Sequence, residues 1–224
     1  MRVVVLSDLH GNLIKVKEPF DLMIICGDVC PVTDHRNQFQ REWINNEFSE
    51  WIKELPYIDD ESKVVMIPGN HDFVFESISK KRLNEFLSKT DGRLVYLDNE
   101  EYWFKGLHIF GCPYCKPLPG WAFCRDNLDK YYSYIPNNLD ILITHDAADF
   151  DKLGTTTEGH NAGRNFGNKL LGDYILKTKP RYYFCGHIHT GTHGLHKYEG
   201  IKVANTSILN EDYQVTYEPL LVVI

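Results

Sequence analysis

The sequence predicts a mixed fold, α/β or α+β, in which helices cover sheets of short buried strands. Five apolar runs, rich in β-branched or aromatic residues and too short for helices, predict those strands. They cover residues 3–7, 21–26, 63–67, 140–144 and 181–185. Apolar residues also recur at helical spacing from Phe39 to Leu55, and Pro56 ends that pattern. The 224 residues show no repeat and no linker, so we expect a single domain over residues 1–224.

The remaining segments predict shorter elements. Two apolar segments flank a Lys-Gly pair at 105–106, and together they predict a β-hairpin. Further helices are expected at residues 79–89 and 168–176, and a further strand at 93–97. Turn-linked strands are expected to finish the chain at 194–198, 201–205, 214–217 and 220–224.

The composition indicates which kinds of binding partner and which cellular compartment to expect. The net charge of −7 argues against binding to long nucleic acid, which usually requires a basic surface. A small phosphorylated substrate remains compatible, because bound metal ions can supply positive charge. No apolar run approaches the roughly 20 residues of a membrane span, and the N-terminus lacks the features of a signal peptide. The six cysteines do not suggest a disulfide framework in a chain of this length, so we expect a cytoplasmic protein. Composition leaves open whether it forms a homodimer.

Polar side chains that can bind metal follow each of the five buried strands. They are Asp8 and His10, Asp28, Asn70 and His71, His145, and His187 and His189. Residues two apart in extended chain point the same way, so Asp8 and His10 should project together. Any one of these groups occurs often by chance. Five in the same structural position predict a common site, because sites form outside the carboxyl ends of strands in α/β sheets.

The donor atoms of this set indicate the metal chemistry. The set contains no thiolate, which argues against a structural zinc cage. Oxygen and imidazole ligands suit manganese, iron, zinc or nickel. These eight side chains are too many for one ion but suit two, and two ions roughly 3.5–4 Å apart need a bridging ligand such as a carboxylate. With two Asp ligands the cluster stays positive, which favours a phosphoryl oxyanion.

The five segments resemble, in order and strand context, the motifs of the calcineurin-like metallophosphoesterases. They are Asp8-x-His10, Gly27-Asp28, Gly69-Asn70-His71-Asp72, His145 and Gly186-His187-x-His189. The resemblance implies a two-sheet β-sandwich flanked by helices, with four layers in the order αββα. It also implies two divalent metal ions, of which manganese is expected and iron, zinc or nickel are alternatives.

The resemblance further implies an activity and a role for each site residue. The chain looks most like the small phosphodiesterase branch related to class III cyclic-nucleotide phosphodiesterases, which hydrolyse small phosphodiesters by a metal-bridging hydroxide. A phosphomonoesterase, a nuclease and a non-catalytic scaffold are the alternatives. His71 would protonate the leaving alkoxide. The other residues would bind metal: Asp8, His10 and His189 the first ion, Asn70, His145 and His187 the second, and Asp28 both.

The sequence departs from the family pattern after Asp28. Many members have an acid three residues later that orients the catalytic histidine, but here that position is Pro31. Either Thr33 or Asp34 takes over, or His71 is held in another way. The segment Cys30-Pro31-Val32 also differs from the serine/threonine phosphatase branch, which argues against a protein phosphatase.

Candidate substrate contacts lie outside the metal motifs. Residues 147–168 have little apolar periodicity and predict a long loop, which is often functional. Its Arg164 and His160 are candidates to contact a substrate phosphate or base. His193, which closely follows the last motif, is a third candidate. Aromatic residues such as Trp121 could stack on a base, but aromatics in such numbers are more often core, so they stay unassigned.

Overall fold

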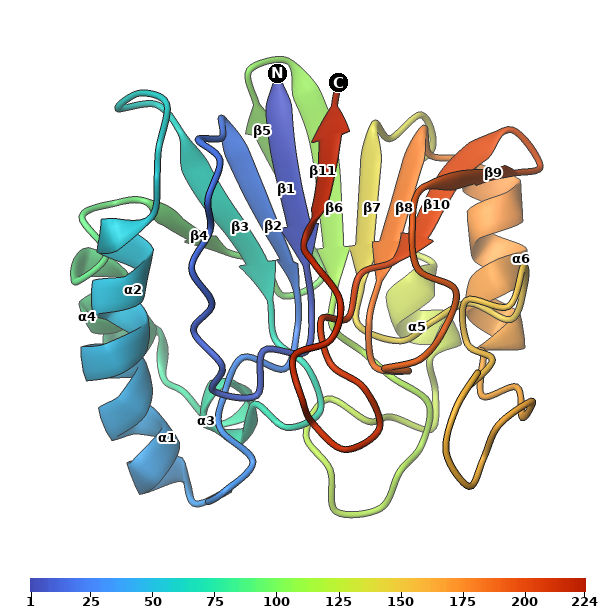
Figure 1. Cartoon of the computed structure of the whole chain (residues 1–224), viewed down its shortest axis with the longest axis horizontal. Coiled ribbons are helices and arrows are strands. Elements are labelled where there is room, and N and C mark those ends of the chain that lie inside the picture. Colours follow the sequence, from blue (N-terminus) through green and yellow to red (C-terminus); the bar gives the residue numbers. More distant parts are fainter.

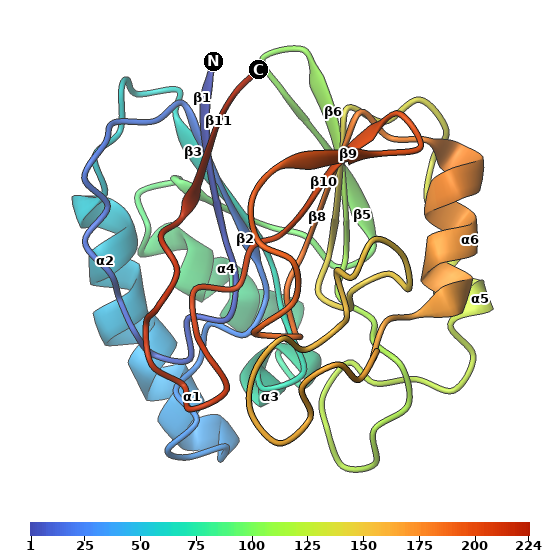
Figure 2. The ribbon, with the colours of Figure 1, turned by 45° about the vertical axis from the view of Figure 1, so that its right-hand side comes forward.

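The computed structural model describes residues 1–224 and contains two mixed sheets packed face to face, with helices on the outer faces (Figures 1 and 2). The first sheet has the strand order β11-β1-β2-β3-β4, and the second has the order β5-β6-β7-β8-β10-β9. This arrangement confirms the predicted two-sheet sandwich flanked by helices. None of its helices combines the length and apolar character needed to cross a membrane.

Four strands of the first sheet run parallel, and the C-terminal strand runs antiparallel beside β1. The strands are β1 (Arg2–Leu6), β2 (Leu22–Cys26), β3 (Lys63–Ile67), β4 (Leu94–Tyr96) and β11 (Leu220–Val223). All five correspond to predicted strands. The three central strands are apolar along almost their whole length because both faces of a parallel sheet are covered.

The second sheet combines a hairpin with parallel strands. Its strands are β5 (Glu100–Phe104), β6 (Leu107–Cys112), β7 (Ile141–Thr144), β8 (Tyr182–Cys185), β9 (His196–Tyr198) and β10 (Ile201–Asn205). Strands β5 and β6 form the predicted hairpin that turns at Lys105-Gly106, and β6, β7, β8 and β10 run parallel. The strand predicted at 214–217 is wrong. That segment makes only an isolated bridge between Val215 and Leu209 and belongs to a loop at the site.

Three apolar layers hold the sandwich together. Val3 and Val5 of β1 face the second sheet, where they join Ile109 and Ile141 in a core between the sheets. On the opposite face of β1, Val4 packs against residues of the outer helices. The alternation of side chains along each strand therefore places half of the β1 residues in each layer.

The helices cover the outer faces, largely as predicted. The helix predicted from Phe39 to Leu55 is continuous but contains a π-helical stretch (Ile44–Phe48) between α1 (Asn37–Trp43) and α2 (Ser49–Glu54). The other predicted helices are α4 (Lys80–Ser88) and α6 (Lys169–Thr178). Asn168 begins α6, because its side chain accepts a hydrogen bond from the backbone N–H of Leu171. Two short helices, α3 (Phe73–Glu76) and α5 (Asp129–Tyr132), were not predicted.

Candidate active site

The metal-competent residues converge where the carboxyl ends of strands from both sheets meet. The ligand atoms of Asp8, His10 and His189 lie within 4.8 Å of one another. The same holds for Asp8, Asp28 and His145, and for His10, Asp28 and His71. His145 Nε2 lies 3.3 Å from Asp28 Oδ2 and 3.0 Å from Asn70 Oδ1. Asp28 therefore lies between two groups of ligand atoms, as a bridging carboxylate requires.

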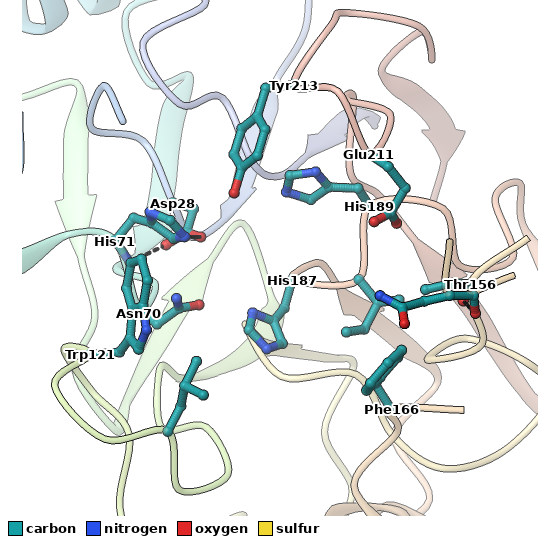
Figure 3. Close-up of a pocket in the computed structure, with 13 residues that line it drawn as sticks. Asp28, Asn70, His71, Trp121, Thr156, Phe166, His187, His189, Glu211 and Tyr213 are labelled. Atoms are coloured by element: carbon teal, nitrogen blue, oxygen red, sulfur yellow. Dashed lines mark hydrogen bonds and ion pairs between the residues drawn. The ribbon is translucent and has the colours of Figure 1, made fainter. Parts of the chain in front are cut away.

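His187 completes the second group. Its ring centroid lies 5.1 Å from that of His145, and its backbone N–H lies 3.1 Å from both carboxylate oxygens of Asp8. Figure 3 shows the ring pointing into a cavity that Asp28 and Asn70 also line. The structure thus brings together all seven side chains that the resemblance assigned to metal.

The backbone at these positions is unusual. Asp8, His10, Asp28 and His187 have φ values of 58°, 44°, 54° and 67°, in the left-handed region. Such a conformation costs a residue with a Cβ roughly 1 kcal/mol or more. Strand β1 ends at Leu6, so the expectation that Asp8 and His10 project together from extended chain is wrong. They converge because each occupies a left-handed position in the turn that follows the strand.

Two glycines allow the ligands to approach the backbone of neighbouring strand ends. Gly27 has a φ of 102°, and a Cβ at this position would lie 2.5 Å from His145 Nδ1. A Cβ on Gly186 would overlap the Ser7 hydroxyl and lie 2.5 Å from Asp8 Oδ2. The His145 ring therefore fills the space that a Cβ on Gly27 would need. Ser7 and Asp8 fill the space that a Cβ on Gly186 would need.

Backbone carbonyls orient two of the imidazoles. His145 Nδ1 lies 2.8 Å from the Cys26 carbonyl, and His189 Nδ1 lies 3.0 Å from the Asn210 carbonyl. A carbonyl only accepts, so Nδ1 carries the proton in each ring. Nε2 of each ring then faces the carboxylates and is the atom that would bind a cation. Metal-binding histidines are typically held in this way.

Burial and neighbouring charges shift the pKa values of the ligand residues in different directions. Burial lowers the pKa of His10 and of His187 to about 3, so both rings are neutral at physiological pH. Burial alone would lower the pKa of His145, but the Asp28 carboxylate outweighs it and raises that pKa to about 10. Burial alone would raise the pKa of Asp28, yet the imidazoles of His145 and His71 hold it well below its usual range.

The residues fit a divalent metal centre. His10 is buried, and neither of its ring nitrogens has a hydrogen-bond partner. Such orphaned polar atoms are rare in proteins because an unpartnered buried group costs free energy. The carboxylates of Asp8 and Asp28 are buried beside it, and buried charges require a counter-charge. Cations bound among these atoms would satisfy His10 Nε2, which lies 3.5 Å from Asp28 Oδ2, and both carboxylates.

His71 lies beside this cluster and is held by a residue that the sequence did not identify. Its Nε2 lies 4.0 Å from Asp28 Oδ2, and its Nδ1 lies 3.3 Å from His35 Nε2. Asp34 instead pairs with the Arg36 guanidinium at the surface, with a shortest distance of 2.5 Å. With Pro31 in place of the usual acid, Thr33, Asp34 or another residue was expected to hold His71. The structure favours another residue, His35.

The remaining acid of the third motif, Asp72, joins two of the strand ends. Its carboxylate accepts hydrogen bonds from the backbone N–H groups of Gly69 at 2.8 Å, Val29 at 3.2 Å and Cys30 at 2.8 Å. Asp72 is completely buried. These bonds place Asp28 and Asn70 at a defined separation, although Asp72 itself belongs to none of the candidate ligand groups.

Replacement of Asp72 by alanine is expected to lower the free energy of unfolding by about 3 kcal/mol or more. The substitution leaves three buried N–H groups unpartnered, and each such group costs about 1–3 kcal/mol. Urea unfolding followed by circular dichroism measures the change. Asp126→Ala, which removes an exposed acid, is the control and should stay within about 0.5 kcal/mol of the wild type. Equal stabilities of the two variants would contradict the role of Asp72.

A cavity of about 260 Å³ opens over the cluster (Figure 3). It is lined by 13 residues, and they include neither Arg164, His160 nor His193. Arg164 is exposed and its guanidinium contacts Asn161 of the same loop. The His193 ring instead stacks on Tyr217, and its Nε2 lies 2.9 Å from the His189 carbonyl.

The cavity walls come from irregular segments in which the sequence did not indicate these side chains as site residues. Residues 147–168 do reach the site, but through Thr156, Asn161 and Phe166. Trp121 comes from the loop after β6, and its ring centroid lies 4.2 Å from that of His71. That loop is tied to the site because the backbone N–H of Ala122 donates to the Asn70 carbonyl at 3.2 Å.

Tyr213 and Glu211 of the C-terminal loop form the opposite rim. The Tyr213 ring centroid lies 5.0 Å from those of His10 and His189, and its backbone has a φ of 59°. Figure 3 shows its hydroxyl directed toward Asp28 and His71. Sequence reasoning missed Tyr213 because the residues that follow it alternate like a strand.

Comparison with known proteins identifies the family. The family model described as calcineurin-like phosphoesterase matches residues 1–191. The chain belongs to the calcineurin-like phosphoesterase family. The resemblance inferred from the five motifs is thereby confirmed. A calcineurin-like phosphoesterase is a metal-dependent phosphoric ester hydrolase, so the expected enzyme class is confirmed as well. The family implies a dinuclear divalent metal centre, and the ligand clusters described above match that requirement.

Known proteins are similar to this calcineurin-like phosphoesterase over nearly its whole length. It is 27% identical to human metallophosphoesterase domain-containing protein 1, over 99% of this chain and 70% of the human protein. It is 26% identical to the Caenorhabditis elegans UPF0046 protein C25E10.12, over 99% of this chain and 80% of that protein. The solved structure of TT1561 of Thermus thermophilus shares the fold, with a TM-score of 0.53 and 13% identity over 91% of this chain and 88% of that chain.

Proposed function

We propose that this enzyme is a phosphodiesterase that hydrolyses small phosphodiesters, such as cyclic nucleotides, with two Mn²⁺ ions. The observation that carries the proposal is the position of the cavity. It joins the ligand cluster, the His71 imidazole and an aromatic wall within one opening. Iron, zinc or nickel would also suit the oxygen and imidazole ligands.

The proposed ligand assignment follows the two groups of atoms. Asp8, His10 and His189 would hold one ion, Asn70, His145 and His187 the other, and Asp28 both. When bound, the two ions would withdraw charge from the phosphoryl group and activate a water molecule at neutral pH. The seven ligand side chains are all in place, which disfavours the alternative of a non-catalytic scaffold.

His71 is the proposed general acid. Its Nε2 faces the ligand cluster at the edge of the cavity, and it is not itself needed to complete either ligand group. A departing alkoxide next to the cluster would lie within reach of this nitrogen. Proton donation to such a leaving group contributes about 10²–10⁴ in rate.

The cavity walls suit a diester that carries a neutral, planar group such as a nucleobase. Trp121 lies on the side of His71, and Phe166 lies on the opposite side of the opening (Figure 3). Their ring faces suit a planar group, and Thr156 and Asn161 offer hydrogen bonds to its edge. No Lys or Arg lines the cavity, while Glu211 adds a carboxylate. A substrate with additional phosphate groups would therefore be repelled, whereas a nucleoside would not.

A panel of substrates tests the proposal. The metal-free protein is reconstituted with Mn²⁺, and kcat/KM is measured for cyclic nucleotides, a simple dialkyl phosphate, nucleoside monophosphates and nucleoside triphosphates. We expect the cyclic nucleotides to be at least tenfold better than the dialkyl phosphate, since stacking contributes about 1–3 kcal/mol per base. We also expect them to be better than the nucleoside mono- and triphosphates, whose additional negative charge would face the Glu211 carboxylate. A preference for monophosphates would overturn the diesterase proposal. Inactivity toward every ester would overturn the proposed phosphoesterase activity altogether.

A further inference from the structure

His35 contacts the proposed general acid from the side opposite the ligand cluster. His71 presents Nε2 toward Asp28 and Nδ1 toward His35, whose Nε2 lies 3.3 Å away. The two nitrogens of one imidazole therefore have separate partners. His35 is itself fixed, because its ring lies 5.2 Å from that of Phe73 and 5.4 Å from that of Trp121.

The loop geometry explains why this position reaches His71. Asp34 and Arg36 flank His35 and form an ion pair with each other, and the Asp34 carboxylate also accepts the backbone N–H of Arg36 at 2.9 Å. Arg36 directly precedes α1, so the chain direction changes at this point. The side chains of Asp34 and Arg36 are thus paired with each other at the surface, whereas the His35 ring points inward to His71.

We propose that His35 is a positioning residue that hydrogen-bonds His71 Nδ1 and so directs its Nε2 toward the leaving group. The inference rests on the proposed role of His71 as general acid. His35 carries its own proton on Nδ1 and accepts the His71 Nδ1–H through Nε2. His71 then transfers the proton on its Nε2 to the leaving oxygen and becomes neutral, with the Nδ1–H still donated to His35. The bond between the two rings persists through the transfer, so the neutral ring keeps a single tautomer.

This arrangement uses a neutral acceptor where many family members have an acid. A neutral imidazole orients the His71 ring through one directional hydrogen bond without adding negative charge beside the cavity. Aromatic packing alone could also hold the His71 ring, because Trp121 and His35 both lie against it. The two explanations differ in whether the acceptor atom of His35 matters.

Two substitutions separate these explanations. His35→Phe keeps an aromatic ring against Phe73 and Trp121 but removes the acceptor. His35→Gln loses the ring but can place an acceptor oxygen near the present Nε2. For an alkyl phosphodiester, whose leaving group requires a proton, we expect His35→Phe to lower kcat about tenfold or more with little change in KM. We expect His35→Gln to restore most of that loss. The reverse order of the two variants would show that packing is what matters and would overturn the inference.

A second substrate and a double variant complete the test. With a p-nitrophenyl phosphodiester, which needs no protonation of its leaving group, His35→Phe should change kcat by less than about threefold. In a His71→Ala background, adding His35→Phe should cause no further loss with the alkyl substrate, because residues that act through one another are not additive. A further tenfold loss there would overturn the inference. Bound metal, measured by elemental analysis, should equal that of the wild type in all variants.

The same measurements distinguish failure of this inference from failure of the proposed function. If His71→Ala behaves alike toward alkyl and p-nitrophenyl leaving groups, the general-acid assignment fails and the role of His35 fails with it. If His71→Ala shows the expected dependence on the leaving group but His35→Phe matches the wild type on both substrates, the inference about His35 alone is overturned.

Discussion

Replacement of Asp28 by asparagine is expected to lower kcat/KM for phosphodiesters by about three orders of magnitude and to reduce the metal content below two ions per chain. Asp28 Oδ2 lies 3.5 Å from His10 Nε2 and 3.3 Å from His145 Nε2, which belong to different ligand groups. An amide keeps the shape but removes the charge that two cations would share. Loss of one ion removes several kcal/mol of transition-state stabilisation, and each 1.36 kcal/mol is about tenfold in rate.

Elemental analysis after dialysis against Mn²⁺ measures the metal content, and a p-nitrophenyl phosphodiester reports activity. The matched control is Asp126→Asn, which makes the same chemical change at an exposed acid. The control should bind two ions and keep full activity. An Asp28→Asn enzyme that retained both ions and full activity would contradict the assignment of Asp28 as the shared ligand.

Replacement of His71 by alanine is expected to lower kcat by about 10²–10⁴ for an alkyl or nucleoside leaving group and by less than about tenfold for p-nitrophenolate. An alkoxide leaves poorly unless it is protonated, whereas p-nitrophenolate is stable as an anion. His71 is not required to complete either ligand group, so the variant should retain its metal. The dependence on the leaving group is therefore a direct measure of proton donation.

Rates for a series of phosphodiesters with leaving groups of rising pKa give this measurement. His108→Ala is a suitable control, because His108 lies on the β5–β6 hairpin, stacked on Trp103, and lines no part of the cavity. It should follow the wild type across the series. Parallel losses for His71→Ala with good and poor leaving groups would remove the general-acid role and leave His71 as a residue of the cavity wall.

The relation between sequence and structure is clearest at the strand ends. Five buried runs were recognisable from composition and length, and the polar residues after them converge because parallel strands of both sheets end at one edge. The reason given for Asp8 and His10 was nevertheless wrong. They meet in a left-handed turn that no pattern in an isolated sequence distinguishes from a continuing strand.

The walls of the cavity show the opposite case. Trp121 and Phe166 are aromatic residues in irregular segments, and an aromatic residue serves equally well in a core or at a binding surface. Only the contact of Trp121 with His71 decides between the two. Arg164 and His160 were reasonable candidates by chemistry, but the hydrogen bonds within their own loop turn other side chains toward the site.

The sequence by itself determined the family and the seven side chains that can hold metal, because these depend on residue types at strand ends and their order along the chain. The sandwich followed from the family resemblance. The tertiary structure alone decided the partner of His71, the inward position of Tyr213 and the composition of the cavity wall. Those depend on contacts between residues far apart in the chain, such as His35 with His71 and Tyr213 with His10, 36 and 203 positions away respectively. Contacts between residues so far apart in the chain cannot be predicted from the composition of either segment alone.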